Sequence, residues 1–109
     1  IEYNANLNKS AFSTEYDIAA KKYQRLAKLL KLHAPNVHIG VNNLIKSIIE
    51  LKKTLTIPAT FKEQGADMNL AQASREEIVN AALNDICTTA NPREASREDL
   101  LKLLDKVLG

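Results

Sequence analysis

Residues 41–55 place an apolar side chain at every third or fourth position, and this periodicity restricts the fold of the chain more than any other feature. β-Branched residues are common in strands, but the repeat here is 3.6 residues rather than two, and strands usually span only about 5–6 residues. The segment is therefore predicted to be an amphipathic helix that Thr56-Ile57-Pro58 ends. Its apolar stripe consists of Val41, Leu44, Ile45, Ile48, Leu51 and Leu55, widened by Ile49.

A second amphipathic helix is predicted over residues 14–32, after a helix end and a loop in residues 1–13. Thr14 is a suitable N-cap, and Asp17 stands in the capping-box position. Pro35 prevents the helix from continuing, because proline lacks an N–H and clashes with the preceding turn. The apolar side of this helix is formed by Tyr16, Ala20, Tyr23, Ala27 and Leu30.

Two Ser-Arg-Glu sequences predict helix starts in the C-terminal half. Ser74 with Glu77, and Ser96 with Asp99, have capping-box spacing. The first helix is expected to end at Cys87. Residues 60–65 are predicted to form one helical turn closed by Gly65, with an irregular connection over 66–73. The expected inward-facing residues are Ile78, Ala81, Ala82 and Ile86 in the first helix and Leu100, Leu103, Leu104 and Val107 in the last.

These patterns predict an all-α fold, a small bundle or array of about four main helices plus one short helix, with no strand. The chain has 109 residues, of which 45% are hydrophobic, so it suffices for one core. Only 5% are aromatic and there is no Trp. The core must therefore be built from Leu, Ile, Val and Ala, which suits helix packing.

Charge and cysteine content exclude several classes of protein. The net charge of +2 comes from 15 basic and 13 acidic residues that are well mixed, which does not indicate nucleic-acid binding. A basic stripe on residues 14–32 is interpreted as a solvated face. One Cys excludes a disulfide framework and favours a reducing, cytoplasmic setting. No apolar run approaches the ~20 residues that span a bilayer. The stripe contains Lys21, Lys22, Arg25 and Lys28.

The residues alone reveal no catalytic machinery. His33 and His38 flank Pro35, but the carboxylates that would complete a metal site are absent nearby, so a solvent-facing loop explains both. Cys87 is interpreted as a small buried hydrophobe at a helix C-terminus or as a residue lining a pocket, and not as a catalytic thiolate. Asn91-Pro92-Arg93-Glu94 has the chemistry of a helix-breaking turn. No catalytic residue and no metal ligand is therefore predicted.

The chain nevertheless resembles the C-terminal helical region of the iron-containing (group III) alcohol dehydrogenases. The resemblance is most specific at Ala81-Ala82-Leu83-Asn84-Asp85-Ile86-Cys87-Thr88 and Ala90-Asn91-Pro92-Arg93. Tyr3-Asn4-Ala5 matches the segment after the family's Pro-His-Gly metal-ligand turn. Ile57-Pro58 with Phe61-Lys62-Glu63-Gln64-Gly65 resembles a conserved joint, although Thr56 replaces its usual Gly. Ala11-Phe12-Ser13 with Tyr16-Asp17 is most similar to the alcohol dehydrogenase half of bifunctional aldehyde–alcohol dehydrogenases.

The resemblance implies that residues 1–109 are a segment of a larger helical domain, preceded by an NAD(P)-binding domain. In such enzymes one Asp and three His hold a divalent metal, Fe²⁺ or Zn²⁺, which polarises the alcohol or aldehyde oxygen during hydride transfer. None of these ligands can be placed on this chain. By resemblance, Cys87, Thr88 and Asn91 line the pocket for substrate and nicotinamide.

Two functions remain open at this point. The first is an alcohol dehydrogenase segment, inactive alone, whose partners are the rest of the enzyme and a small alcohol or aldehyde, with homo-oligomers allowed. The alternative is an independent helical protein-interaction module without catalysis. A segment should expose large apolar surfaces where neighbours packed, whereas a module should expose at most one groove-sized patch. No nucleic acid or membrane partner is expected in either case.

Overall fold

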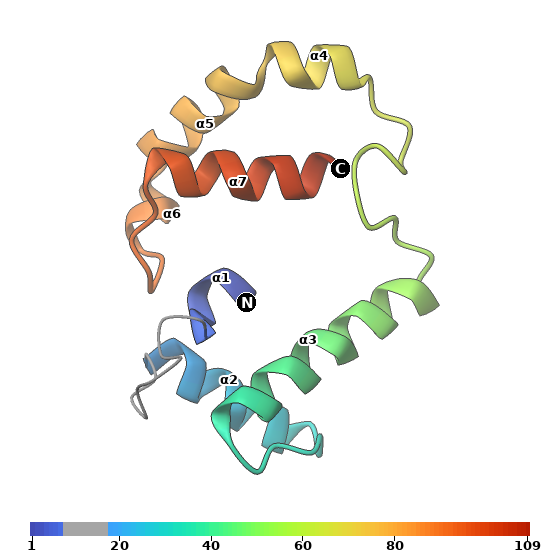
Figure 1. Cartoon of the computed structure of the whole chain (residues 1–109), viewed down its shortest axis with the longest axis vertical. Coiled ribbons are helices and arrows are strands. Elements are labelled where there is room, and N and C mark those ends of the chain that lie inside the picture. Colours follow the sequence, from blue (N-terminus) through green and yellow to red (C-terminus); the bar gives the residue numbers. More distant parts are fainter. Residues whose placement is uncertain (8–17) are drawn as a thin grey trace. The chain divides into compact units, whose positions relative to one another are not determined.

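The protein is described by a computed structural model over residues 1–7 and 18–109. Within these ranges it contains seven helices and no strand, which confirms the predicted all-α class (Figure 1). The chain divides into two compact units, Ile1–Leu55 and Thr56–Gly109. None of the helices in the described ranges combines the length and the hydropathy needed to cross a membrane.

The first unit contains α1 (Glu2–Ala5), α2 (Ile18–Leu29) and α3 (Val37–Thr54). The predicted cap at Thr14 and Asp17 lies outside the described residues. Helix α2 ends before Leu32 because Lys31 adopts a left-handed backbone, with φ of 58°. The Leu32 N–H then donates to the Ala27 carbonyl at 2.9 Å, and the Lys31 N–H donates to the Lys28 carbonyl at 2.9 Å. This pair of bonds is a Schellman C-cap, which satisfies carbonyls that the helix end would otherwise leave unpaired.

Helix α3 begins at Val37, not at the predicted Val41. Asn36 is its N-cap, and the Asn36 side chain accepts a hydrogen bond from the Ile39 N–H at 2.9 Å. The asparagine side chain satisfies an N–H that the first turn leaves without a helical partner, so the helix starts one turn earlier than its apolar stripe.

Helices α2 and α3 pack closely and form the core of the first unit. Gly40 permits this approach, because a Cβ built there would lie 2.9 Å from the Gln24 Cγ and 3.1 Å from the Ala34 Cβ. The Gln24 side chain also donates to the Ala34 carbonyl at 3.1 Å. The buried hydrophobic residues of this unit are Ala5, Ala20, Ala27, Ala34, Val41 and Leu44.

Only the first part of the predicted α3 stripe is buried. Val41 and Leu44 lie in the core, and Ile45 packs against it. From Ile48 onward the large apolar side chains are exposed, and Leu51 and Leu55 reach 56% and 59% exposure. The C-terminal half of α3 therefore carries an apolar face that is exposed to solvent.

The second unit contains α4 (Met68–Ala73), α5 (Arg75–Asn84), α6 (Ile86–Thr89) and α7 (Arg97–Leu108). Helix α4 replaces the predicted irregular connection, because the Asp67 side chain caps it by accepting from the Asn69 and Leu70 N–H groups. Residues 60–65 form the predicted single turn, in which the Gln64 N–H donates to the Thr60 carbonyl at 3.2 Å, and the turn does not extend into a helix. Gly65 closes that turn with φ of 89°, a conformation in which glycine is favoured.

Only one of the two predicted capping boxes forms. Ser96 and Asp99 form one, since each side chain accepts from the other's backbone N–H. Ser74 makes no side-chain cap, so the box predicted with Glu77 is absent. The Ser74 N–H instead donates to the Leu70 carbonyl, and its backbone is helical (φ −89°, ψ −1°) because α4 runs directly into α5. An N-cap normally needs an extended backbone.

Helices α5 and α7 pack against each other (Figure 1). Polar side chains join their surfaces. The Arg75 guanidinium donates to both Asp105 carboxylate oxygens, at 2.7 Å and 2.6 Å. Arg97 contacts Glu76 and Asn80. Four of the predicted inward-facing residues are exposed instead. Ile78 is 42% exposed while the adjacent Val79 is buried, and Val107 is 47% exposed while Leu108 is buried. The other two are Ala81 and Ile86.

Candidate functional site

The motif that carries the resemblance contains a break in the helix at Asp85. The Asp85 backbone is extended (ψ 131°), and its carboxylate accepts a hydrogen bond from the Cys87 N–H at 2.7 Å. Asp side chains compete in this way with helical hydrogen bonds, so α5 ends at Asn84 and α6 starts at Ile86. Cys87 thus lies in the first turn of α6 and is exposed, which corrects its interpretation as a buried helix end. Ile86, predicted to be buried, is 83% exposed.

Two threonine hydroxyls of α6 donate to backbone carbonyls. The Thr88 hydroxyl donates to the Ala82 carbonyl in α5 at 2.6 Å, and the Thr89 hydroxyl donates to the Ile86 carbonyl at 2.7 Å. The first bond ties α6 to the last turn of α5 across the break at Asp85. Both hydroxyl protons are therefore used within the backbone of the motif.

The chain leaves α6 through the turn predicted at Asn91-Pro92-Arg93-Glu94. The Asn91 N–H donates to the Thr88 carbonyl at 3.2 Å, and the Asn91 side-chain amide donates to the Arg93 carbonyl at 2.5 Å. This second contact holds the turn by a side chain that reaches its own backbone two residues on. The turn leads to Ser96, where the capping box begins α7.

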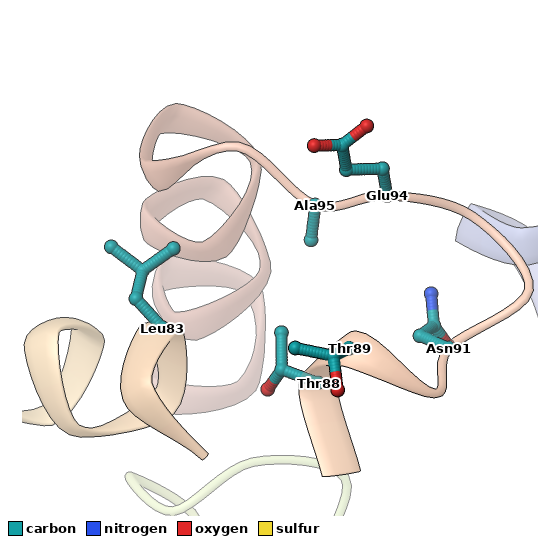
Figure 2. Close-up of a pocket in the computed structure, with 6 residues that line it drawn as sticks. All are labelled: Leu83, Thr88, Thr89, Asn91, Glu94 and Ala95. Atoms are coloured by element: carbon teal, nitrogen blue, oxygen red, sulfur yellow. The ribbon is translucent and has the colours of Figure 1, made fainter. Parts of the chain in front are cut away.

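A hollow of about 450 Å³ lies between α5, α6 and this turn. Of the three residues predicted to line a pocket, Thr88 and Asn91 line this hollow, whereas Cys87 is not among its lining residues. Sequence reasoning did not single out Leu83, Thr89, Glu94 or Ala95 as pocket residues. Figure 2 shows the whole lining, which consists of Leu83, Thr88, Thr89, Asn91, Glu94 and Ala95.

An ion pair between α5 and α7 shifts the pKa values of both its partners. The hydrogen bonds from Arg75 lower the pKa of the Asp105 carboxyl, and the charge of the guanidinium acts in the same direction. The pKa of Arg75 is raised by the same contact. The Arg75–Asp105 pair therefore joins α5 to α7, and its role is structural.

The described residues offer no complete metal site. No three His, Cys, Asp or Glu side chains within residues 1–7 and 18–109 lie close enough together to hold an ion. His33 and His38 are both exposed, and the Asn43 side chain donates to the backbone carbonyl of His33. Among the described residues, the side chains thus do not fit a resident metal.

The predicted solvated stripe on α2 has the expected exposure. Lys21, Lys22, Arg25 and Lys28 are all exposed, on the side of α2 away from the buried Ala20 and Ala27.

Comparison with known proteins identifies the chain's family. The C-terminal model of the Fe-containing alcohol dehydrogenase family matches residues 2–108. An NADPH-dependent butanol dehydrogenase of Clostridium saccharobutylicum is 30% identical over 87 residues, which cover 80% of this chain and 22% of that protein. An aldehyde-alcohol dehydrogenase of Clostridium acetobutylicum is 40% identical over 72 residues, covering 66% of this chain and 8% of that protein.

A third relative, the lactaldehyde reductase of Escherichia coli, is 27% identical over 89 residues, covering 80% of this chain and 22% of the reductase. The chain thus spans less than a quarter of the length of each of these relatives. Because the family model matches almost every residue, the resemblance seen in the late motif extends over the whole sequence. The chain belongs to the Fe-containing alcohol dehydrogenase family and corresponds to its C-terminal part.

Proposed function

We propose that the chain is the C-terminal helical part of a metal-dependent NAD(P) alcohol dehydrogenase, which interconverts alcohols and aldehydes or ketones by hydride transfer. The observation that carries this proposal is the family match over residues 2–108. The printed names of the relatives support it, since they include a butanol dehydrogenase, an aldehyde-alcohol dehydrogenase and a lactaldehyde reductase.

Residues 1–109 would then form one segment of a larger helical domain. Exposed apolar side chains on α2, α3 and α4 support this, including Leu29 at 76%, Leu51 at 56% and Leu70 at 64% exposure. Large apolar side chains exposed in this number are normally covered by a partner in the assembled protein. The rest of the longer polypeptide is the partner we propose for it, in an enzyme of the cytoplasm that can form homo-oligomers.

The chain's own contribution would be binding rather than chemistry. We place the Fe²⁺ or Zn²⁺ ion and the main NAD(P) contacts on other parts of the polypeptide. Thr88 and Asn91 would line the cavity for substrate and nicotinamide through the hollow beside α6. Cys87, exposed on α6 next to Thr88, would reach the same cavity from the neighbouring surface.

An activity measurement on the complete polypeptide tests this proposal. The protein is loaded with Fe²⁺ or Zn²⁺ and mixed with NADH or NADPH and butyraldehyde, and loss of the reduced nicotinamide is followed by absorbance. We expect turnover that a chelator abolishes, and none from residues 1–109 alone. Absence of turnover with both cofactors and both metals, over short and branched aldehydes, would refute the proposal.

A further inference from the structure

The two halves of α3 differ in what supports them. All of α3 lies within the described residues, and Leu44 is the last of its buried residues. Ile45 still packs against the core, whereas Ile48, Leu51 and Leu55 are 38%, 56% and 59% exposed. Packing of an apolar face is what gives most protein helices their stability. The last two turns of α3 therefore lack the support that stabilises its first half.

The side-chain bonds of the last turn are local. The Thr54 hydroxyl donates to the Glu50 carbonyl at 3.0 Å, and the Lys53 ammonium lies 3.1 Å from a Glu50 carboxylate oxygen. A threonine hydroxyl that bonds back to the preceding turn slightly destabilises a helix, and an exposed ion pair contributes little. These contacts join residues of one turn, so they do not anchor that turn to the core.

The residue that follows the helix has an unfavourable backbone conformation. Leu55 is the C-cap of α3, and Thr56 then adopts a φ of 56°. In this left-handed region a Cβ crowds the following carbonyl oxygen, so a β-branched residue is rarely found there and glycine is favoured. For a residue with a Cβ, the cost shifts an equilibrium by roughly five- to thirtyfold.

Strain at Thr56 is coupled to order in the last turn. Thr56 is left-handed while α3 ends at Leu55, and unwinding of the last turn allows it to relax into the extended region that any residue adopts. Unwinding also lengthens the chain, because a residue spans roughly 3.3 Å when extended and 1.5 Å in a helix. Thr56 is the first residue of the second unit, so the length that changes is that of the connection between the units.

We propose that residues 48–55 form an order–disorder switch, which unwinds and refolds in the free chain and stays helical when a partner covers Leu51 and Leu55. Thr56 sets the balance, because its strain favours the unwound state. A partner shifts that balance because it binds the helical state better than the unwound one. The inference rests on the proposed function for the identity of this partner, the rest of the longer polypeptide.

Three substitutions at Thr56 separate backbone strain from the chemistry of the side chain. Thr56→Gly removes the Cβ and with it the strain. Thr56→Asn keeps a side chain of a type that tolerates the left-handed region. Thr56→Val keeps the branch at Cβ and removes the hydroxyl. Lys31→Gly is the matched control, because Lys31 has a φ of 58° after the end of a different helix, α2.

The experiment is hydrogen exchange of the 109-residue chain, read by mass spectrometry at a dilution where the chain is monomeric. Peptides over residues 48–55 should exchange at least about tenfold faster than peptides over residues 39–45. Thr56→Gly should slow exchange in 48–55 roughly two- to fivefold, after the greater chain freedom of glycine is set against the relieved strain. Thr56→Asn should slow it too, whereas Thr56→Val and Lys31→Gly should leave it unchanged.

The same peptides are then compared in the complete polypeptide, where residues 48–55 should exchange more slowly than in the isolated chain. Wild-type exchange in Thr56→Gly, equal slowing by Thr56→Val or Lys31→Gly, or no slowing in the complete polypeptide would overturn the inference. The measurement needs no metal, cofactor or turnover. Its failure beside an active complete enzyme refutes the switch alone, and success of the isolated-chain measurements beside an inactive enzyme refutes the proposed function alone.

Discussion

At the scale of single residues, Ser74 and Ser96 begin the same Ser-Arg-Glu sequence but differ in the hydrogen bonds they make. Only Ser96 caps its helix. We predict that Ser96→Ala lowers the free energy of unfolding by about 1 kcal/mol, the usual cost of a lost N-cap. Ser74→Ala should change it by less than about 0.5 kcal/mol. Urea unfolding of both variants, followed by circular dichroism, measures the difference, and equal losses would contradict the assignment of caps.

Gly40 supplies a second residue-scale prediction. In a helix interior, alanine is normally more stabilising than glycine by about 1 kcal/mol. A Cβ at Gly40, however, would lie 3.2 Å from the Gln24 Cα, which is backbone and cannot move aside easily. Overpacking of this kind costs about 1–3 kcal/mol, so Gly40→Ala should destabilise the chain. The exposed Lys46→Ala on the same helix is the control, and a Gly40→Ala variant more stable than wild type would rule out the close approach of α2 and α3.

The helix before Cys87 could be predicted from the sequence, but the break that places Cys87 in α6 could not. The helical period correctly placed a helix before it, but periodicity cannot detect a break within a continuous apolar pattern. The break depends on the Asp85 carboxylate accepting from the Cys87 N–H, a local competition with the helix. The sequence signal for this break was Asp85 itself, an Asp inside an otherwise helical pattern.

At the scale of elements, most of the helices could be predicted and several of their ends could not. Helices α3 and α7 lie where their apolar periodicity placed them, because burial of one face decides their existence. Their ends depend on single side chains. Asn36 starts α3 one turn before its stripe, and Asp67 starts α4 where no periodicity exists. Ser74 fails as a cap because the helix preceding it continues into it, which is a property of the neighbouring segment.

The packing of α5 on α7 predicts a dependence of stability on pH. The pKa of Asp105 is lowered below 3.8 in the folded chain, chiefly by the hydrogen bonds from Arg75. A lowered carboxyl pKa stabilises the fold above the unfolded value of about 3.9, and this contribution is lost as pH falls through the folded pKa. Wild type should therefore lose more stability between about pH 6 and pH 2 than Asp105→Asn does.

Chemical unfolding at several pH values checks this difference. Glu98→Gln is the matched control, because it removes the exposed Glu98–Lys102 pair within α7, and such pairs contribute only about 0–1 kcal/mol. Identical pH profiles for wild type and Asp105→Asn would show that the Arg75 contact does not influence folding.

At the scale of the whole molecule, the exposed apolar faces predict self-association of the isolated chain. Leu51 in α3 and Leu55, the C-cap of α3, are 56% and 59% exposed. Without a covering partner such surfaces associate in water. Sedimentation velocity should show oligomers that grow with concentration, and the double variant Leu51→Lys with Leu55→Lys should reduce them. A strictly monomeric wild-type chain at high concentration would favour the independent helical module.

Only part of the lining of the hollow beside α6 could be predicted from the sequence. The resemblance of residues 85–93 to a known family pointed to Thr88 and Asn91, which lie on the hollow. The hollow itself depends on how the turn at Asn91 brings Glu94 and Ala95 opposite α6, and no periodicity contains that information. The direction of the threonine hydroxyls follows from their distances to the Ala82 and Ile86 carbonyls.

The central claim is that residues 1–109 are the helical C-terminal part of a metal-dependent alcohol dehydrogenase. Sequencing the coding region immediately upstream of the codon for Ile1 tests it most directly. We predict an open reading frame with Pro-His-Gly shortly before Ile1, a His-x-x-x-His or similar pattern further back, and a dinucleotide-binding domain before that. A start codon or an unrelated linker at that point would contradict the claim and leave a free-standing helical module.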